Sequence, residues 1–102
     1  MAQHHIDQQQ TTRFLTAIGD PRRLQILFAL GSRRMNVGEI TTQLAISRPA
    51  VSHHLKILRE ADVLLSVKIG QEVFYWINTD HIVTTLRSLA DEVAKMSGTE
   101  AD

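Results

Sequence analysis

The sequence predicts a mainly α fold with a small β component, in the α+β class. Apolar residues recur at helical spacing over most of the first 61 residues, a stretch rich in β-branched and aromatic residues follows at 63–77, and helical spacing returns at 80–96. At 102 residues, 43% of them apolar, the chain is long enough for one modest hydrophobic core. We therefore expect residues 1–102 to form a single domain.

The composition excludes several classes of protein. Cysteine is absent, which excludes disulfides and thiolate metal sites. The chain has no run of about 18 apolar residues, so we expect no membrane helix. The N-terminus is polar, with His4, His5 and the run Gln8–Gln10, and it has no signal peptide pattern, which favours a cytoplasmic protein.

Two helices are predicted before residue 31. The first runs from about residue 4 to residue 18, and Gly19 and Asp20 end it. Asp20 is a good N-cap for the second helix, and Pro21 fits the first turn, where its missing N–H has no intrahelical partner to lose. The apolar positions of the two helices include Ile6, Phe14, Leu15, Ile18, Leu24, Leu27, Phe28 and Leu30.

The next two helices are joined by a very short connection. A helix is predicted over Val37–Ala45, with Ile40 and Leu44 one turn apart. Ile46–Ser47 is too brief for anything but a tight turn into the following helix. Two short helices joined in this way form a helix-turn-helix, here at about 37–61.

The second helix of this motif is amphipathic and cationic. Ser47 is a good N-cap, and Pro49 suits the first turn. One narrow face is apolar, formed by Val51, Leu55 and Leu58. The remaining surface carries the polar side chains Arg48, Ser52, His53, Lys56 and Arg59. A short, capped helix of this kind suits the major groove of DNA.

After residue 62 the pattern becomes that of a β-hairpin. The segments 63–69 and 72–77 are rich in β-branched and aromatic residues, and Gly70–Gln71 fits a two-residue turn between them. A hairpin that directly follows a helix-turn-helix occupies the position of a wing, here at about 63–77.

A final helix is predicted at about 80–96. Its apolar stripe, spaced alternately by four and three residues, consists of Ile82, Leu86, Leu89, Val93 and Met96. So regular a stripe at the end of a small domain packs either on the domain's own core or on a second chain.

The net charge of zero conceals an uneven distribution. Residues 21–59 carry seven basic residues against one acidic residue, whereas residues 60–102 carry three basic residues against eight acidic ones. Such a chain either presents a cationic face to phosphate groups or has a solvated surface on which the charges happen to be uneven.

With its elements in this order, the chain resembles the ArsR/SmtB family of winged-helix repressors across roughly residues 12–95. The resemblance rests on Gly19–Leu27 (GDPRRLQIL), Val37–Ile40 (VGEI), Ser47–Ala61 (SRPAVSHHLKILREA) and the hairpin that ends in Phe74–Trp76. It implies a homodimer formed by the first and last helices, an inverted-repeat operator, and release of DNA when an effector binds. The interface residues implied are Phe14, Ile82, Leu86, Leu89, Val93 and Met96.

The usual effector of that family is a metal or metalloid, and here the sequence departs from the family pattern. The family's thiolate site needs cysteines near the start of the third helix, where this chain reads Met35–Glu39 (MNVGE), and that site is therefore excluded. The four positions of the family's site on the last helix are filled by Thr79, His81, Glu92 and Lys95. Only His81 and Glu92 among these are ligand types, so we expect no metal cofactor, and the effector stays unidentified. His4 and His5 are additional sources of nitrogen ligands.

The residues expected to contact DNA lie on the helix-turn-helix and the wing. Arg48 is the main expected contact to a base or a phosphate, since Arg bonds guanine bidentately, while Lys68 and Gln71 are expected phosphate contacts on the wing. His54 lies nearer the apolar stripe and is expected to be structural. The full set is Ser47, Arg48, Ser52, His53, Lys56, Arg59, Lys68 and Gln71.

Catalysis has no support in the sequence, which lacks a Gly-rich phosphate loop, a cysteine nucleophile and an HExxH motif. The main expectation is a DNA-binding transcriptional regulator that acts as a homodimeric repressor. One alternative is a winged helix used only for protein contacts, which predicts no salt-dependent duplex binding. Another is a metal-responsive sensor with a rearranged His/carboxylate site. A third is a small metal-binding or buffering protein, which predicts tight metal uptake without operator affinity.

Overall fold

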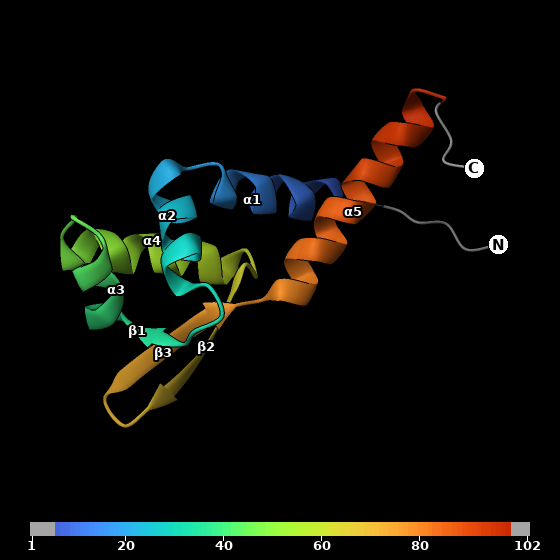
Figure 1. The fold of residues 1–102 in the computed structure, drawn as a ribbon. Helices are drawn as coiled ribbons and strands as arrows, with labels where there is room; N and C mark the ends of the chain where they lie inside the picture. The colour runs from blue at the N-terminus through green and yellow to red at the C-terminus, as the bar shows by residue number, and fades with distance from the viewer. Residues whose placement is uncertain (1–5, 99–102) are drawn as a thin grey trace.

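The computed structural model describes residues 6–98, and within them it contains five helices and a three-stranded antiparallel sheet (Figure 1). In chain order the elements are α1 (Gln8–Ile18), α2 (Pro21–Leu30), β1 (Met35–Asn36), α3 (Val37–Gln43), α4 (Arg48–Glu60), β2 (Leu64–Ile69), β3 (Glu72–Ile77) and α5 (Thr79–Met96). The helices make up most of the structure, and the β2–β3 hairpin projects from it as a wing. The predicted mainly α, winged helix-turn-helix fold is confirmed.

Helix α1 begins later than the sequence predicts. Asp7 is its N-cap, and the carboxylate accepts a hydrogen bond from the backbone N–H of Gln10 at 3.1 Å. This cap satisfies an N–H that has no partner inside the helix, and it therefore defines the start of the helix. The predicted start near residue 4 is wrong for Ile6 and Asp7, which precede the helix, while residues 4 and 5 lie outside the described range.

The turn between α1 and α2 has no room for a side chain at Gly19. A Cβ atom there would lie 2.9 Å from the carbonyl oxygen of Leu15. Asp20 then caps α2 as predicted, because its Oδ1 accepts hydrogen bonds from the N–H groups of Arg22 at 2.8 Å and Arg23 at 3.3 Å. The short, capped connection brings the start of α2 close to the end of α1.

Helices α3 and α4 form the helix-turn-helix. Asn36 and Glu39 make a capping box at the start of α3: the Asn36 Oδ1 accepts from the Glu39 N–H at 2.8 Å, and a Glu39 carboxylate oxygen accepts from the Asn36 N–H at 2.9 Å. Helix α3 ends at Gln43, two residues before the predicted end, because Leu44 has an extended backbone. The hydroxyl of Ser47 caps α4.

The wing has the predicted hairpin form. Strands β2 and β3 pair antiparallel, from Leu64 opposite Ile77 to Ile69 opposite Glu72. Gly70 follows β2 with φ +62°, a left-handed conformation that glycine adopts without a Cβ penalty. This residue allows the chain to reverse within two positions.

The sheet contains one strand more than the sequence predicts. Its order is β1-β3-β2, and β1 is added through Met35 opposite Tyr75 and Asn36 opposite Phe74. A strand of two residues is too short to show an alternating pattern, so the sequence does not reveal it. The strand joins the start of the helix-turn-helix to the wing.

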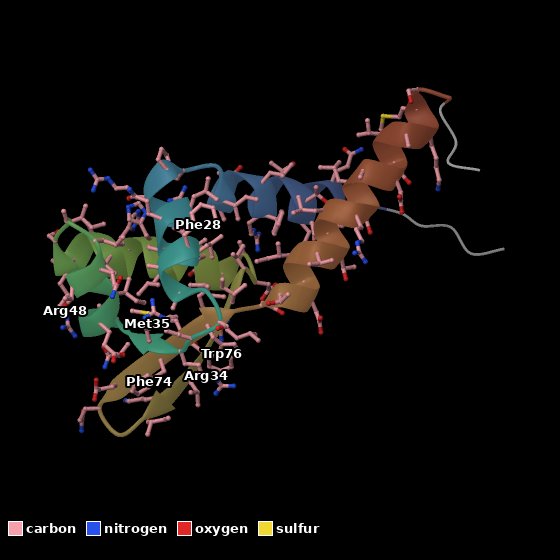
Figure 2. All side chains as sticks on the ribbon, in the orientation of Figure 1. Phe28, Arg34, Met35, Arg48, Phe74 and Trp76 are labelled. Atoms are coloured by element: carbon pink, nitrogen blue, oxygen red, sulfur yellow. The ribbon has the colours of Figure 1, made fainter. Side chains whose placement is uncertain are left out.

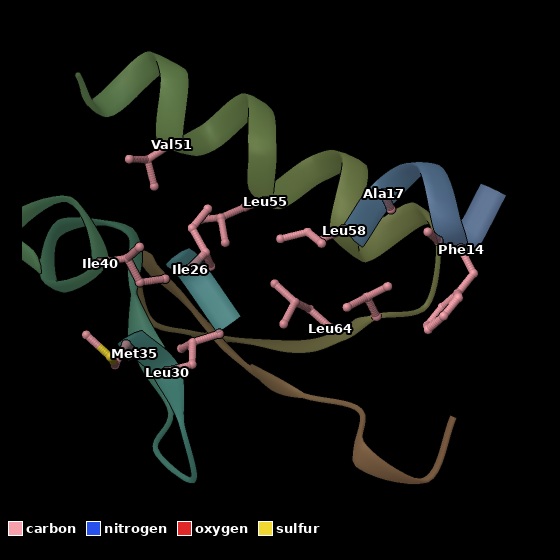
Figure 3. Close-up of a cluster of buried hydrophobic side chains, with 12 residues drawn as sticks. Phe14, Ala17, Ile26, Leu30, Met35, Ile40, Val51, Leu55, Leu58 and Leu64 are labelled. Carbon is pink, nitrogen blue, oxygen red and sulfur yellow. The ribbon is translucent and has the colours of Figure 1, made fainter. Parts of the chain in front are cut away.

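The hydrophobic core lies where α1, α2, α3 and α4 meet the inner side of the sheet (Figure 3). Its buried members are Phe14, Ala17, Ile26, Leu30, Met35, Ile40, Val51, Leu55, Leu58, Ala61, Val63 and Leu64. Among the described residues, no polar or charged side chain belongs to this buried set. The core therefore fixes the helix-turn-helix and the base of the wing by apolar packing.

Helix α5 packs on this core only near its start, where Ile82 lies against the buried cluster. It has 18 residues, none of which is buried, and Figure 1 shows it leaving the body of the domain beyond its first turns. Several apolar side chains of α5 are exposed: Val83 by 37%, Leu86 by 42%, Val93 by 52% and Met96 by 77%.

Candidate nucleic-acid interface

Helix α4 has one buried face and one polar face. Val51, Leu55 and Leu58 are completely buried and anchor the helix in the core. The opposite side exposes Ser52, His53, Lys56 and Arg59. The helix is thus held from behind by apolar contacts while hydrogen-bonding and cationic side chains face the solvent.

The start of α4 presents Arg48 to the solvent. Ser47 Oγ accepts a hydrogen bond from the Ala50 N–H at 3.3 Å, so this hydroxyl is occupied by capping. The Arg48 Nη1 lies 3.4 Å from the position that a Cβ atom would take at Gly38. Within residues 6–98 no carboxylate pairs with Arg48, and its guanidinium is available to an external acceptor.

A groove of about 550 Å³ separates the helix-turn-helix from the wing. Its lining includes Asn36, Gly38, Glu39, Arg48, Gln71, Glu72 and Tyr75. Figure 2 shows Arg48 at the end of the molecule opposite α5, the end towards which the wing also extends. The groove brings Arg48 and Gln71 together from segments far apart in the sequence, and it also contains two carboxylates.

The predicted wing residues are exposed, and one predicted helix residue is engaged within the protein. Lys68 and Gln71 lie at the solvent-facing end of the hairpin. At the other end of α4, the Arg59 Nε donates a hydrogen bond to the Ser66 hydroxyl at 2.9 Å. Arg59 therefore ties α4 to β2 through its Nε, and only its terminal nitrogens remain for a further partner.

A cation also covers the aromatic part of the wing. The guanidinium carbon of Arg34 lies 3.8 Å from the ring centroid of Trp76, which is a cation–π contact. Arg34 precedes β1, so this contact holds the α2–β1 connection against β3. Figure 2 shows the two side chains beside each other.

His54 is turned away from the exposed face of α4, in line with its expected structural role. Its Nδ1 lies 3.3 Å from the Arg23 Nη1. Burial lowers the pKa of His54, and the positive charge of Arg23 lowers it further. The carboxylate of Asp20 raises this pKa but does not reverse the shift. Sequence reasoning missed the role of Arg23, because its three partners belong to other helices.

The predicted interface residues do not all lie on the surface. Phe14 is completely buried in the core of the single chain, where its ring packs edge-on against His81 with the centroids 5.9 Å apart. Its assignment to an interface is a mistake, because its side chain has no surface left for a partner. The neighbouring Leu15 is 39% exposed and is the apolar residue that α1 presents to the solvent.

The two metal-ligand candidates are not brought together. The Nε2 atom of His81 is buried without a hydrogen-bond partner, while Glu92 pairs with Lys95 at 3.8 Å. Across residues 6–98, no group of three or more ligand-type side chains is placed to hold a metal ion. His4 and His5 fall outside this range.

Within residues 6–98, no helix is long and apolar enough to cross a membrane.

Comparisons with known proteins agree with this geometry. The family model described as "Bacterial regulatory protein, arsR family" matches residues 20–64, which include α2, the helix-turn-helix and the start of β2. The "Transcriptional repressor SmtB homolog" of Synechocystis is 33% identical over 85 residues, 83% of this chain and 64% of that protein. The "Transcriptional repressor SdpR" of Bacillus subtilis is 43% identical over 63 residues, 62% of this chain and 70% of that protein. The chain thus spans about two thirds of the length of these relatives.

Solved structures give the same result. An "ArsR-like Transcriptional Regulator from Rhodococcus sp. RHA1" superimposes with a TM-score of 0.81 at 28% sequence identity. The alignment covers 88% of this chain and 85% of that one, so the similarity extends well beyond the helix-turn-helix.

Proposed function

Because this chain belongs to the ArsR family of bacterial regulatory proteins, and is thus a DNA-binding transcriptional regulator and not an enzyme, we propose that it acts as a homodimeric repressor at an inverted-repeat operator. The observation that carries this proposal is the two-sided surface of α4. Its side chains Val51, Leu55 and Leu58 are buried in the core, and its opposite side is polar and exposed. A helix anchored in this way can enter a major groove without exposing apolar surface.

The proposed DNA contacts divide into two kinds. Arg48 stands without an ion-pair partner in the described chain and is assigned to a base edge or a phosphate at the start of α4. Contacts that position the protein on phosphates are assigned to Ser52, His53, Lys56, Lys68 and Gln71, with a smaller part for Arg59. Ser47 acts chiefly through capping, which fixes the backbone on which Arg48 stands.

The homodimer is proposed to form through α5 and α1. Helix α5 has no buried residue, and its stripe includes Ile82, Leu86, Leu89, Val93 and Met96. Burial of such a stripe contributes about 25 cal/mol per Å² of apolar surface removed from water. Leu15 replaces Phe14 as the apolar contact from α1. Two copies related by a twofold axis present two α4 helices, which matches an inverted repeat.

Repression is proposed to follow from occupancy of the operator, and the protein is assigned to the cytoplasm, where the DNA is. Both relatives compared above are named repressors. An activator would bind the same kind of site and raise transcription, so the sign of regulation needs its own measurement.

A metal-responsive sensor is the second candidate function. The observation that favours it is the buried Nε2 atom of His81, which has no partner in the single chain. Against it, the carboxylate of Glu92 is paired with Lys95, and a functional site needs a full set of ligands with suitable geometry.

The proposal is tested by selecting bound sequences from random duplex DNA with the full chain. An inverted repeat with half-sites about one helical turn apart is expected, together with an affinity that falls steeply as salt rises. A reporter gene placed behind the selected site then distinguishes a repressor from an activator. Failure to enrich any sequence would contradict the proposed function.

A further inference from the structure

Arg23 lies where three helices meet. It belongs to the first turn of α2, and its guanidinium reaches back to the last turn of α1, where Nε donates to the Ala17 carbonyl at 2.6 Å and Nη2 donates to the Thr16 carbonyl at 3.3 Å. Its remaining terminal nitrogen, Nη1, lies 3.3 Å from the Nδ1 of His54 in α4. One side chain therefore bridges α1 and α4.

The contacts with α1 are favourable for a reason of charge. The last carbonyls of a helix have no partner inside it, and they form the negative end of the helix dipole. The last turn of α1 contains no basic residue of its own. Arg23 supplies both the missing donors and a positive charge, so its position relative to α1 is well defined.

The contact with α4 determines the protonation state of His54. Arginine has only N–H donors, so a hydrogen bond between these two atoms requires the Nδ1 of His54 as acceptor, and hence a neutral ring with its proton on Nε2. The charged or titratable groups that surround this ring are Asp20 in the α1–α2 turn, Arg22 and Arg23 on α2, and His53 on α4. A proton on Nδ1 would remove the acceptor and place a second cation beside Arg23.

We propose that Arg23 is a positioning residue for DNA binding, which links α4 to the end of α1 through neutral His54, and that this link is lost when His54 is protonated. This inference rests on the proposed function. His53 and His54 point about 100° apart on the helix, so the side that Arg23 holds is distinct from the exposed side assigned to DNA. Val51, Leu55 and Leu58 keep α4 in the core when this contact is lost, so the expected effect is a graded weakening of DNA binding.

The first test examines the tautomer without DNA. The ring ¹⁵N chemical shifts of His54, measured by NMR near pH 7.5 on the full chain, are expected to show a proton on Nε2 and a free lone pair on Nδ1. The Arg23→Gln variant is expected to lose this preference. A wild-type ring with its proton on Nδ1 would overturn the inference whatever the DNA-binding result.

The second test compares two substitutions of His54. His54→Asn keeps an acceptor that does not titrate at nearly the same distance, whereas His54→Leu has a similar volume and no acceptor. Near pH 7.5, His54→Leu is expected to bind the selected duplex about tenfold more weakly, because a charged donor is left without its partner. His54→Asn is expected to bind within about twofold of wild type, since the contact is retained. Thermal unfolding of each variant confirms that it is folded at the assay temperature.

A matched control separates contact from charge. Arg22→Gln removes the same charge from the same helical turn, but no bond joins the Arg22 side chain to His54. At fixed salt, Arg23→Gln is expected to weaken duplex binding about tenfold and Arg22→Gln less than about threefold. Equal losses in the two variants would overturn the inference.

The pH profile gives a further measurement. The ratio of wild-type affinity to His54→Asn affinity is expected to fall as pH decreases through the lowered pKa of His54. His53 is present in both proteins, so the comparison isolates the change at His54. A constant ratio, or unchanged binding by His54→Leu, overturns the inference alone. A wild-type chain that binds no duplex overturns the proposed function, and with it the role of Arg23 in DNA binding. The tautomer of His54 is measured without DNA, so that result is independent of this outcome.

Discussion

The side-chain amide of Asn36 donates a hydrogen bond to the carboxylate of Glu72, and this contact joins the helix-turn-helix to the wing. The same asparagine caps α3 through its Oδ1 and pairs with Phe74 in the sheet. Glu72 is the first residue of β3, directly after the turn of the hairpin. Asn36 thus fixes the start of α3 and the orientation of the wing together.

An exchange of charge tests this relationship. Asn36→Asp keeps a good N-cap but places two carboxylates face to face, so we expect a loss of about 1 kcal/mol in the free energy of unfolding and weaker DNA binding. In the Asn36→Asp, Glu72→Gln double variant the glutamine amide can donate to the new carboxylate, and both properties are expected to recover. Urea denaturation and duplex titration measure them; no recovery in the double variant would show that the contact is incidental.

Arg48 and Lys56 are expected to affect DNA binding in different ways. If Arg48 reads a base, Arg48→Ala should lose roughly 1–3 kcal/mol of binding free energy and relax the sequence preference at one position per half-site. Lys56→Ala should weaken binding to all sequences about equally and lower the salt slope by about one unit per lost phosphate contact. Titrations of the selected duplex and of single-base variants over a range of salt measure both. Wild-type binding by both variants would remove α4 from the interface.

The apolar stripe of α5 is expected to hold two chains together. Leu86→Glu with Leu89→Glu should give monomers in sedimentation experiments and abolish operator binding, because two carboxylates would have to be buried in the interface. The matched control is Thr84→Glu with Ser88→Glu, which adds the same charge to the opposite side of the helix and should stay dimeric. A wild-type monomer at micromolar concentration would refute the proposed dimer.

Metal ions are expected to leave DNA binding unchanged. Arsenite, cadmium and lead have no thiolate to bind in this chain, and Zn²⁺ or Ni²⁺ at low micromolar concentration find only His81 and Glu92 among the four positions of the terminal site. Stoichiometric release of DNA by Zn²⁺ or Ni²⁺, lost in His81→Ala, would instead establish a metal sensor. Such a site, completed by His4 and His5 from the same or the partner chain, would need neutral imidazoles, so its affinity should collapse below about pH 6.

Asp20 is expected to contribute to stability in a pH-dependent way. Burial raises the pKa of this carboxyl, but the hydrogen bonds from Arg22 and Arg23 and the charge of Arg23 outweigh burial and leave the pKa below its usual value of 3.8. A carboxyl with a lowered pKa in the folded state stabilises the protein above its unfolded pKa, and that stability is lost as pH falls through the folded pKa. Asp20→Asn keeps the cap and should reduce the loss of unfolding free energy at low pH, as measured by urea denaturation. If the variant loses as much stability in acid as wild type, the loss belongs to other carboxyls.

The sequence predicts the elements whose signals are local. Capping residues such as Asp20 and Ser47, and the apolar stripe of α4, depend on neighbours within one or two turns, and these features are all present. Burial against other elements is not local, which explains the error at Phe14. The strand at Met35–Asn36 and the contacts of Arg23 exist only because distant segments meet, and no periodicity within one segment encodes them.

The exposed outer turns of α5 lead to the expectation that its helicity depends on protein concentration. The turns of α5 beyond the domain body have no core to pack on, and most helical stability in proteins comes from packing of an apolar face, so the proposed dimer should stabilise these turns. Folding of this segment and association are then one equilibrium, and dilution should lower the helical circular dichroism signal along with the dimer fraction. If the proposed homodimer forms through this helix, occupancy of an inverted-repeat operator should fall with dilution more steeply than one-site binding allows, because dissociation removes the twofold form.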